Sequence, residues 1–443
     1  MINNIIFKAG YFIRRPNVIH YYEKFKENQW KPYAWLKKEQ EVKLSELIQF
    51  VYKNVPYYTK LFNQHGITFR DISTIESLNR IPILTKQIIK QNWQDFIPKT
   101  MNKIKFIHGS TGGSTGDPLR YRMSIEDYER GRALLYCGWG YGGYELGDKV
   151  GVIAGASLIP SAMSDSIKKI QDFILIHRHY SAFEMTEHRL YEYLNAINKW
   201  KPDFLRGYAT AIYVFARFIR DNDLKLKFQP KAIFTTAEKL LTNHRNLIEN
   251  VYSAKVFDQY GLNDGGISAF ECEQHDGMHI CTERAILEVV DKDGNQIARG
   301  EGKILATSLY NYALPFIRYD TGDLGIISES GCRCGRETLL LKEIGGRVTD
   351  FLQINNTIIG SPVLTVLMGK FDIDQYQIIQ EDHESITCMI VKGRTYKVKD
   401  EEFIRNSFYS HVGKINIKFN YVESFPKAKV DKHKFIINKL KED

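Results

Sequence analysis

The sequence predicts an α/β protein with three parts. These are a large N-terminal domain of mostly parallel strands, a β-rich subdomain and a small α+β domain at the C-terminus. Its 443 residues are too many for one compact core. Helical and apolar extended segments alternate through the first half, which is typical of parallel pairing. Near Glu283 the pattern changes to β-branched runs broken by Asp-Gly and Gly-Glu-Gly, which indicates hairpins.

The order of elements follows from local patterns. Residues 17–94 read as largely helical, because Leu44, Leu47, Ile48 and Val51 recur at helical spacing and the run stops before Pro56. Helices then alternate with the apolar strands "DKVGVIAGA", "PKAIFTTAE" and "AKVFDQYG". After residue 350 short mixed elements fit a domain of roughly 90 residues. We therefore expect a large domain over 1–349 and a small domain over 350–443.

Composition limits the class of protein. Hydrophobic residues are 43% and charged residues 26%, as in ordinary globular proteins, and the net charge of +9 suits an anionic ligand such as ATP. We expect no nucleic-acid partner. No apolar run approaches the roughly 20 residues of a membrane helix. We expect a cytoplasmic protein whose six cysteines do not form a disulfide framework.

The N-terminal stretch "MINNIIFKAGYFIRRP" places its charges after its apolar part, which is the wrong order for a signal peptide. The favoured interpretation is a first helix packed on the domain. The alternative is an interfacial anchor that contacts a membrane peripherally, because apolar residues precede Lys8, Arg14 and Arg15.

The stretch "HGSTGGSTGDP", residues 108–118, predicts a phosphate-binding loop. Glycines let the backbone approach a phosphate and hydroxyl side chains add donors, whereas the lysine of the usual phosphate loop is absent. The alternative is a plain surface turn. The candidate residues are Ser110, Thr111, Gly112, Gly113, Ser114, Thr115 and Gly116.

Three later motifs offer polar side chains beside glycines. In "FDQYGLNDGG", Asp264 suits Mg²⁺, or alternatively caps a helix N-terminus. In "RYDTGDLG", Asp323 on a tight turn suits the two hydroxyls of a ribose, or is only a turn residue. In "GGRVTDFL", Arg347 and Asp350 stand at the predicted domain junction, where the alternative is a turn with a surface ion pair.

In their order and spacing these four motifs resemble the core motifs of adenylate-forming enzymes, the acyl-CoA synthetase superfamily. The closer resemblance is to its phenylacetate–CoA ligase and capsular-polysaccharide ligase branch. The stretches "VPYYTKLF", "IPILTK", "ECEQHDGMH" and "CRCGR" fit that branch too. The resemblance covers roughly residues 36–434.

The resemblance implies an enzyme in which a carboxylate attacks the α-phosphorus of ATP with Mg²⁺ bound. The loop from Thr111 to Gly116 would wrap the triphosphate. Asp264 would take the metal-binding place, where the family more often has glutamate. Asp323 would hold the ribose, assisted by Arg347, and Asp350 would be the hinge of the small domain. The adenine site would be lined by Ala237, Glu238, Asp258, Gln259, Tyr260 and Gly261.

The resemblance also implies a catalytic lysine near the C-terminus. The stretch "FPKAKVDKHKF" matches, and counting from Pro426 selects Lys432. Asp431 stands where the family usually has glycine, so Lys429 or Lys434 are alternatives, as is a solvated basic tail. Asp117 is a second departure, because many relatives carry lysine there.

A second cluster predicts a structural zinc site. Cys272 and His279 lie seven apart, and Cys332 and Cys334 form a C-R-C-G turn, so three thiolates and an imidazole could bind a tetrahedral ion. Some members of the family carry a similar set. The alternatives are four ordinary buried residues, or Cys281 as a competing ligand.

The predicted function is activation of a carboxylic acid as an acyl-adenylate with pyrophosphate release, followed by transfer to CoA. One alternative is a ligase that joins the acid to an amino sugar or another amine or hydroxyl acceptor in surface polysaccharide biosynthesis. Another is a catalytically inactive nucleotide-binding homologue. The sequence identifies neither the acid nor the acceptor.

Overall fold

The structure is a computed structural model that describes most of the chain. The described residues are 2–111, 119–155, 170, 172–182, 185–328, 331–345, 351–355, 357–360, 364, 367, 368, 371, 373–393, 396–423, 425 and 436–440. The chain divides into two compact units. Unit 1 comprises residues 1–109, 120–147 and 257–347, and unit 2 comprises 110–119, 148–256 and 348–443.

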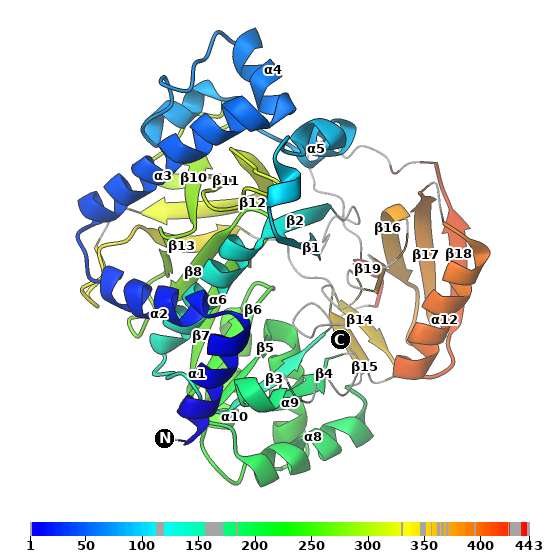
Figure 1. The fold of residues 1–443 in the computed structure, drawn as a ribbon. Helices are drawn as coiled ribbons and strands as arrows, with labels where there is room; N and C mark the ends of the chain where they lie inside the picture. The colour runs from blue at the N-terminus through cyan, green and yellow to red at the C-terminus, as the bar shows by residue number, and fades with distance from the viewer. Residues whose placement is uncertain are drawn as a thin grey trace. The chain divides into compact units, whose positions relative to one another are not determined.

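Unit 1 begins with helices, as the sequence predicts (Figure 1). The long helix α3 buries Leu44, Leu47, Ile48 and Val51 on one face and ends at Asn54, so the predicted stop before Pro56 is confirmed. The α-helices of this unit are α1 (Ile2–Arg14), α2 (Asn17–Asn28), α3 (Tyr33–Asn54), α4 (Pro56–Gln64), α5 (Lys86–Gln91) and α6 (Ile125–Gly140). Short 3-10 helices are η1 (Glu76–Arg80), η2 (Trp93–Phe96) and η3 (Met101–Lys103).

The strands of unit 1 form the predicted β-rich subdomain. Their order is β10-β11-β12-β13-β9-β8-β7, and each neighbouring pair is antiparallel. The strands are β7 (Lys255–Leu262), β8 (Ile267–Glu271), β9 (Met278–Ile280), β10 (Ala285–Val290), β11 (Gly300–Ser308), β12 (Tyr319–Ser328) and β13 (Leu340–Gly345). A separate pair, β1 (Phe106–Ser110) and β2 (Arg120–Ser124), flanks the glycine-rich loop.

The middle segment of unit 2 supplies the predicted parallel strands, in the order β6-β5-β3-β4. They are β3 (Val150–Ala154), β4 (His177–Ser181), β5 (Phe204–Tyr208) and β6 (Ala232–Thr236). Every residue of β3, β5 and β6 is buried, as expected of parallel strands covered on both faces. The intervening helices are α8 (Glu187–Trp200), α9 (Ala209–Asp221) and α10 (Thr242–Tyr252). The α/β fold class is confirmed.

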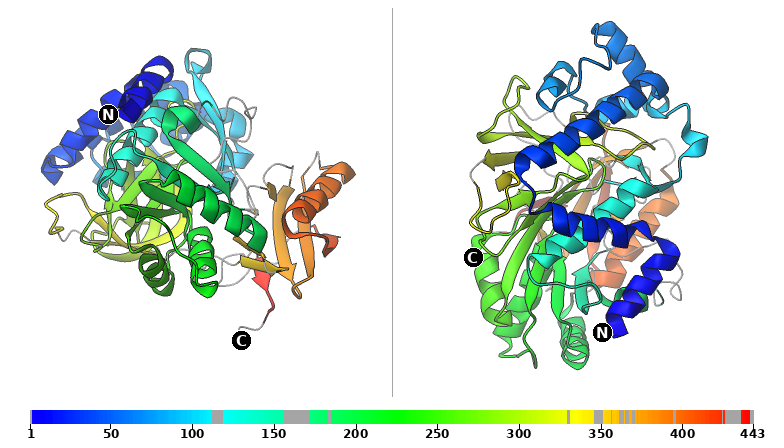
Figure 2. Two further views of the ribbon diagram at one scale, coloured as in Figure 1. Left: turned by 90° about the horizontal axis from the view of Figure 1, so that it is seen from below. Right: turned by 60° about the vertical axis from the view of Figure 1, so that its left-hand side comes forward.

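The C-terminal segment forms the predicted α+β arrangement, in which α12 covers one face of a four-stranded sheet (Figure 2). The sheet order is β18-β17-β16-β19, and β14 pairs with β15. The elements are β14 (Phe351–Ile354), β15 (Thr357–Gly360), β16 (Ile373–Gln380), β17 (Ser385–Lys392), α12 (Val398–Val412), β18 (Asn416–Tyr421) and β19 (Ile436–Asn438). The domain boundary at residues 349 and 350 stays a prediction.

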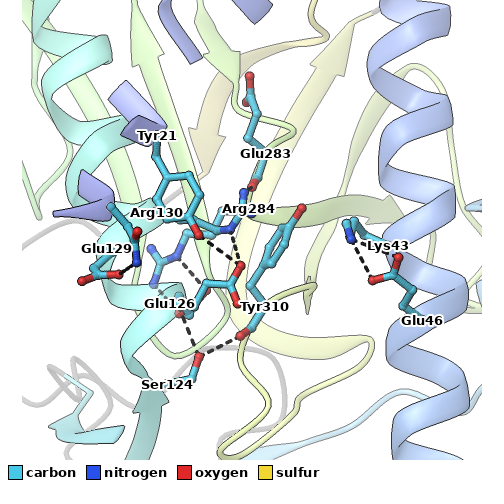
Figure 3. A network of polar contacts seen from close by, with 12 residues as sticks. Tyr21, Lys43, Glu46, Ser124, Glu126, Glu129, Arg130, Glu283, Arg284 and Tyr310 are labelled. Carbon is cyan, nitrogen blue, oxygen red and sulfur yellow. Dashed lines mark hydrogen bonds and ion pairs between the residues drawn. The ribbon is translucent and has the colours of Figure 1, made fainter. Parts of the chain in front are cut away.

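Arginines embedded among acidic and aromatic side chains join the helices of unit 1 to its strands. Arg130 of α6 lies over the rings of Tyr21 and Tyr310, 4.3 and 3.5 Å from their centroids, and donates to Glu126 (Figure 3). Arg284, just before β10, makes two hydrogen bonds of 3.0 and 2.8 Å to the buried carboxylate of Asp127. Because each guanidinium is paired, its burial is tolerated.

Arg318 makes the widest set of such contacts. Its side chain is 3% exposed and pairs with Glu288 of β10, which is 1% exposed, at 3.1 Å. It also donates to the backbone carbonyls of Ile81 and Gly294 at 2.9 and 2.7 Å. The Arg318 side chain therefore joins the segment at Ile81, the turn after β10 and the start of β12.

We expect Arg318→Met to destabilise the protein by about 3–5 kcal/mol, because it leaves the Glu288 carboxylate buried without its counter-charge. The midpoints of thermal and urea unfolding measure the effect. The double variant Arg318→Met/Glu288→Leu should recover part of the loss. Lys303→Met, which breaks an exposed 3.9 Å pair with Asp320, serves as the control and should change stability by less than about 1 kcal/mol. Equal losses in the single and double variants would contradict this account.

Candidate functional site

The two ends of the glycine-rich loop are fixed to each other. The backbone N–H of Thr111 donates to the carbonyl of Leu119 at 2.9 Å, and the N–H of Leu119 donates to the Thr111 hydroxyl at 2.8 Å. Ser110 ends β1. The loop residues predicted to contact phosphate, Gly112, Gly113, Ser114, Thr115 and Gly116, lie outside the described residues.

Asp323 and Tyr260 of unit 1 contact each other directly. The Tyr260 hydroxyl donates to Oδ2 of Asp323 at 2.8 Å, so the side chain from β7 orients the one from β12. Burial and the Asp323 charge raise the pKa of Tyr260 well above its ordinary value, so the hydroxyl keeps the proton that it donates. The second carboxylate oxygen of Asp323 is not used in this bond.

The backbone of β12 explains how Asp323 projects from a strand. Lys303 of β11 pairs with Leu324 of β12, and Leu305 pairs with Asp320. A step of two residues along β11 therefore lies opposite a step of four residues along β12, which is a bulge in β12. Gly322 in this bulge has a φ of +78°, a conformation that favours glycine. The sequence predicted a tight turn here. The structure differs because Asp323 stands on a strand bulge.

Asp264 lies between β7 and β8 and is 3% exposed. The alternative in which it caps a helix is therefore wrong. Burial raises its pKa, while the positive charge of Lys86 and the Tyr319 hydroxyl oppose that shift. Oδ2 of Asp264 makes no hydrogen bond of normal geometry within the part of the chain that is described. A buried oxygen of this kind fits the ligand chemistry of Mg²⁺.

Glu238 and Ala237 belong to unit 2. Glu238 accepts a 2.7 Å hydrogen bond from the backbone N–H of Thr210 in the first turn of α9, where a carboxylate is stabilised by the helix dipole. Burial nevertheless raises the pKa of Glu238, and its Oε1 has no hydrogen-bond partner among the described residues. Ala237 has a φ of +70°, in the left-handed region that non-glycine residues rarely adopt.

The remaining predicted adenine-site residues are held within β7. The indole N–H of Trp139 on α6 donates to the side-chain oxygen of Gln259 at 3.2 Å. The backbone N–H of Asp258 donates to Glu271 at 2.9 Å. Gly261 pairs with Ser268 of β8. Gln259 thus has a hydrogen bond to α6 inside unit 1 that the sequence did not predict.

The structure brings together three of the predicted side chains in unit 1, namely Tyr260, Asp264 and Asp323. It adds Lys86 and Tyr319, which sequence reasoning missed as site residues. The available signals were weak: Lys86 ends the stretch "IPILTK", and Tyr319 stands inside "RYDTGDLG". Arg347, Asp350 and Lys432 lie outside the described residues, so their roles stay predictions.

The four predicted metal ligands converge. The ligand atoms of Cys272, His279, Cys332 and Cys334 all lie within 4.8 Å of one another. Sγ of Cys272 is 3.6 Å from Sγ of Cys332, and Sγ of Cys334 is 3.3 Å from Nε2 of His279. Ligands of a tetrahedral zinc ion lie roughly 3.3–3.8 Å apart, given its bond lengths of about 2.0–2.3 Å. The set therefore fits zinc.

The surroundings favour the protonation state that a metal ligand needs at His279 and Cys334, whereas burial raises the pKa of the Cys272 thiol. Burial, with the nearby charge of Arg336, lowers the pKa of His279 to about 4, so the imidazole is neutral at neutral pH. Its other nitrogen, Nδ1, lies 2.8 Å from the Thr338 hydroxyl, which orients the ring. Burial opposes ionisation of Cys334, but hydrogen bonds from Arg336 outweigh it and lower the pKa of the thiol.

Comparisons with known proteins show which proteins the chain resembles. Residues 351–439 match the family model described as the CapK C-terminal domain. The chain is 27% identical to Protein CapK of Staphylococcus aureus, over 98% of this chain and 96% of that protein. It is 24% identical to a phenylacetate-coenzyme A ligase of Thermus thermophilus, with 79% of each chain covered, and 26% identical to the Escherichia coli phenylacetate-coenzyme A ligase, over 75% and 76%.

Among solved structures the chain is similar to 2-hydroxyisobutyryl-CoA ligase in complex with 2-HIB-AMP and CoA. The TM-score is 0.64 at 17% identity, over 93% of this chain and 92% of that one. This likeness shows a shared fold. The sequence relatives agree with the resemblance predicted from the motifs: the chain is a homologue of Protein CapK and of phenylacetate-coenzyme A ligases. The prediction that the chain is an enzyme of the ligase class is confirmed by these relatives.

We expect the purified protein to carry about one zinc ion per chain, measured by elemental analysis. Cys334→Ser and His279→Gln should each reduce the zinc content severalfold and lower the melting temperature, because a closed tetrahedral site loses a ligand. Cys281→Ser is the matched control and should keep its zinc, since Cys281 is not among the four clustered ligands. A wild-type protein without zinc, or a loss of zinc only in Cys281→Ser, would contradict the assignment.

Proposed function

We propose that this protein activates a carboxylic acid with ATP and transfers the acyl group to CoA. In the first half-reaction a carboxylate oxygen attacks the α-phosphorus, pyrophosphate leaves and an acyl-adenylate forms. In the second, the CoA sulfur attacks the acyl carbonyl, AMP leaves and a thioester forms. Both reactants of the first step are anions, so its catalysis depends on positioned donors and cations.

One observation carries this proposal: the Tyr260–Asp323 hydrogen bond lies beside a buried Asp264 whose Oδ2 has no partner within the described chain. Asp323, oriented by Tyr260, can accept hydrogen bonds from both hydroxyls of a ribose. Because Tyr260 stays protonated, it fixes the carboxylate without competing for the ribose protons. The pair thus sets the position of the nucleotide before chemistry begins.

Asp264 is the residue that we assign to the magnesium ion. Bound there, Mg²⁺ would neutralise phosphate charge. Lys86 opposes protonation of Asp264, which favours the ionised carboxylate that a cation needs. Glu238 and Ala237 are assigned to the adenine, and Ser110 and Thr111 to the start of the loop that wraps the triphosphate. Asp258, Gln259 and Gly261 keep their predicted place beside the adenine.

The remaining roles are assigned by resemblance. Residues Gly112 to Gly116 contact the phosphates, Arg347 assists the ribose, and Asp350 is the hinge about which the small domain moves. Lys432 supplies the cation of the first half-reaction, with Lys429 and Lys434 as the alternatives. We place the reaction in the cytoplasm, where ATP and CoA are available.

CoA is the proposed acceptor because relatives named phenylacetate-coenzyme A ligase align over most of the chain. A second candidate acceptor is an amine or hydroxyl group, such as that of an amino sugar. The near full-length similarity to Protein CapK, together with the CapK C-terminal match, favours it. The two candidates share the adenylate and differ only in the nucleophile that consumes it.

We expect pyrophosphate release when the protein is given ATP and the right member of a panel of carboxylic acids, and thioester formation when CoA is added. A coupled pyrophosphate assay and mass spectrometry of the products measure the two steps. Adenylate formation followed by transfer only to an amine or sugar would replace CoA by the second candidate. No pyrophosphate with any acid and no ATP binding would favour the inactive homologue.

The same assay tests the lysine assignment. Lys432→Ala should abolish adenylate formation while ATP binding and the melting temperature remain as in the wild type. Lys429→Ala and Lys434→Ala are the matched controls, because they remove the same charge from the same stretch. Full activity in Lys432→Ala with loss of activity in Lys434→Ala would show that the alignment of the tail is wrong.

We expect Tyr260→Phe to raise the KM for ATP about tenfold, since it removes a hydrogen bond of about 1.5 kcal/mol to a charged group. Tyr191→Phe, which removes a 3.3 Å surface hydrogen bond to Asn222, should leave this KM unchanged. Steady-state kinetics at saturating acid separate the two variants. An unchanged KM in Tyr260→Phe would mean that Asp323 does not hold the ribose.

A further inference from the structure

Helix α1 presents two apolar faces, of which only one is packed. On the inner face Phe7 and Tyr11 are buried against Tyr136 of α6. The Phe7 and Tyr136 rings lie 5.3 Å apart, and the hydroxyls of Tyr11 and Tyr136 share a 2.7 Å hydrogen bond. This face confirms the favoured prediction of a first helix packed on the domain.

The outer face of α1 is exposed and apolar. Ile2, Ile5, Phe12 and Ile13 are 73%, 61%, 76% and 81% exposed. Ala9 between them is also exposed. Their spacing of three, four, three and one residues puts them on one side of a helix, opposite the buried pair. Isolated exposed apolar residues need no explanation, but a continuous stripe along one helix indicates a binding surface.

Hydrogen bonds and close packing fix the direction of this face. The Asn4 side chain donates to the carbonyl of Leu146, and the Asn4 backbone passes so close to Gly147 that a Cβ there would lie 2.7 Å from it. At the other end Val18 of α2 is fully buried. Turning the outer face inward would break these contacts, so the stripe stays exposed.

The charges nearest to the stripe in the sequence are positive. Lys8, Arg14 and Arg15 lie on α1 or directly after it, and no acidic residue precedes Glu23 in the sequence. Lys8 is half exposed and lies 3.9 Å from Glu23, while the Arg15 guanidinium lies 5.7 Å from the centre of the Tyr128 ring. Long basic side chains beside an apolar stripe can reach anionic headgroups while the stripe enters the acyl region.

We propose that the outer face of α1 is a docking surface for an anionic lipid bilayer, on which the helix lies parallel to the membrane plane. Charge complementarity favours this occupant. A second copy of the chain would bring two sets of Lys8, Arg14 and Arg15 together, and four large side chains fall short of the roughly 800 Å² per partner of a stable dimer. No described helix is long and apolar enough to cross a membrane. The proposal does not depend on the proposed function.

Flotation of the full chain with lipid vesicles tests the proposal. We expect binding to vesicles of phosphatidylcholine with about 30% phosphatidylglycerol, and about tenfold weaker binding to phosphatidylcholine alone or in high salt. Phe12→Ser/Ile13→Ser should weaken binding at least about tenfold. Arg14→Gln should weaken it severalfold, with a smaller salt dependence than the wild type.

The matched control is Leu241→Ser/Val398→Ser, which removes two exposed apolar side chains elsewhere, 40% and 85% exposed. It should bind vesicles like the wild type. Circular dichroism and melting temperature verify that both double variants are folded. Equal binding by the wild type and Phe12→Ser/Ile13→Ser would overturn the proposal. So would a dimer in light scattering that this variant abolishes, if vesicle binding is absent.

Discussion

The buried ion pair between Arg318 and Glu288 is the constraint on which the geometry of unit 1 depends. Arg318 has a φ of +49°, a conformation unfavourable for a residue with a side chain. The free-energy cost of this backbone conformation is offset by charge-assisted hydrogen bonds from the Arg318 side chain to Glu288, to the carbonyl of Ile81 and to the turn after β10. Its backbone carbonyl accepts from Leu84, whose own carbonyl accepts from Asp320. These two bonds hold Leu84 beside the start of β12, and Lys86 follows two residues later. The positive charge of Lys86 therefore lies close enough to Asp264 to affect the pKa of its carboxyl group.

The cysteine and histidine cluster imposes a second constraint, which begins at the end of β8 that is farther from Asp264. Cys272 directly follows β8, His279 lies in β9, and Cys332 and Cys334 precede β13. The β9–β13 pairing is short, only Leu340 to His279 and Leu341 to Met278, so the ligands join segments that few backbone hydrogen bonds connect. Arg336 lies between Trp30 and Tyr141, 4.5 and 4.0 Å from their centroids, which places a fixed positive charge beside the thiols. A closed metal site there would stabilise a long connection rather than catalyse a reaction.

Local patterns predicted the features that depend on local sequence. The buried parallel strands, the hairpins after Glu283 and the C-x-C turn were all readable, because each is set by neighbouring residues. The local sequence around Asp323 predicts a turn and not a bulge, since the bulged geometry depends on the register with β11. Likewise, local sequence does not distinguish a helix cap from a metal ligand at Asp264, and the Trp139–Gln259 hydrogen bond joins residues 120 apart. Contacts at such separations depend on the folded topology, which residue spacing alone does not encode.

A series of packed side chains connects helix α1 with the residues that we assign to the nucleotide. Tyr136, against which α1 packs, has its ring 5.5 Å from that of Trp139, and Trp139 donates to Gln259, the neighbour of Tyr260. Such a route transmits a signal only if one of its elements has two alternative arrangements. Along it the described side chains are buried and engaged in ring or hydrogen-bond contacts, and Trp139 is 1% exposed. The proposed membrane docking at α1 would therefore set where the proposed reaction takes place and would leave the geometry of Tyr260 and Asp323 unchanged.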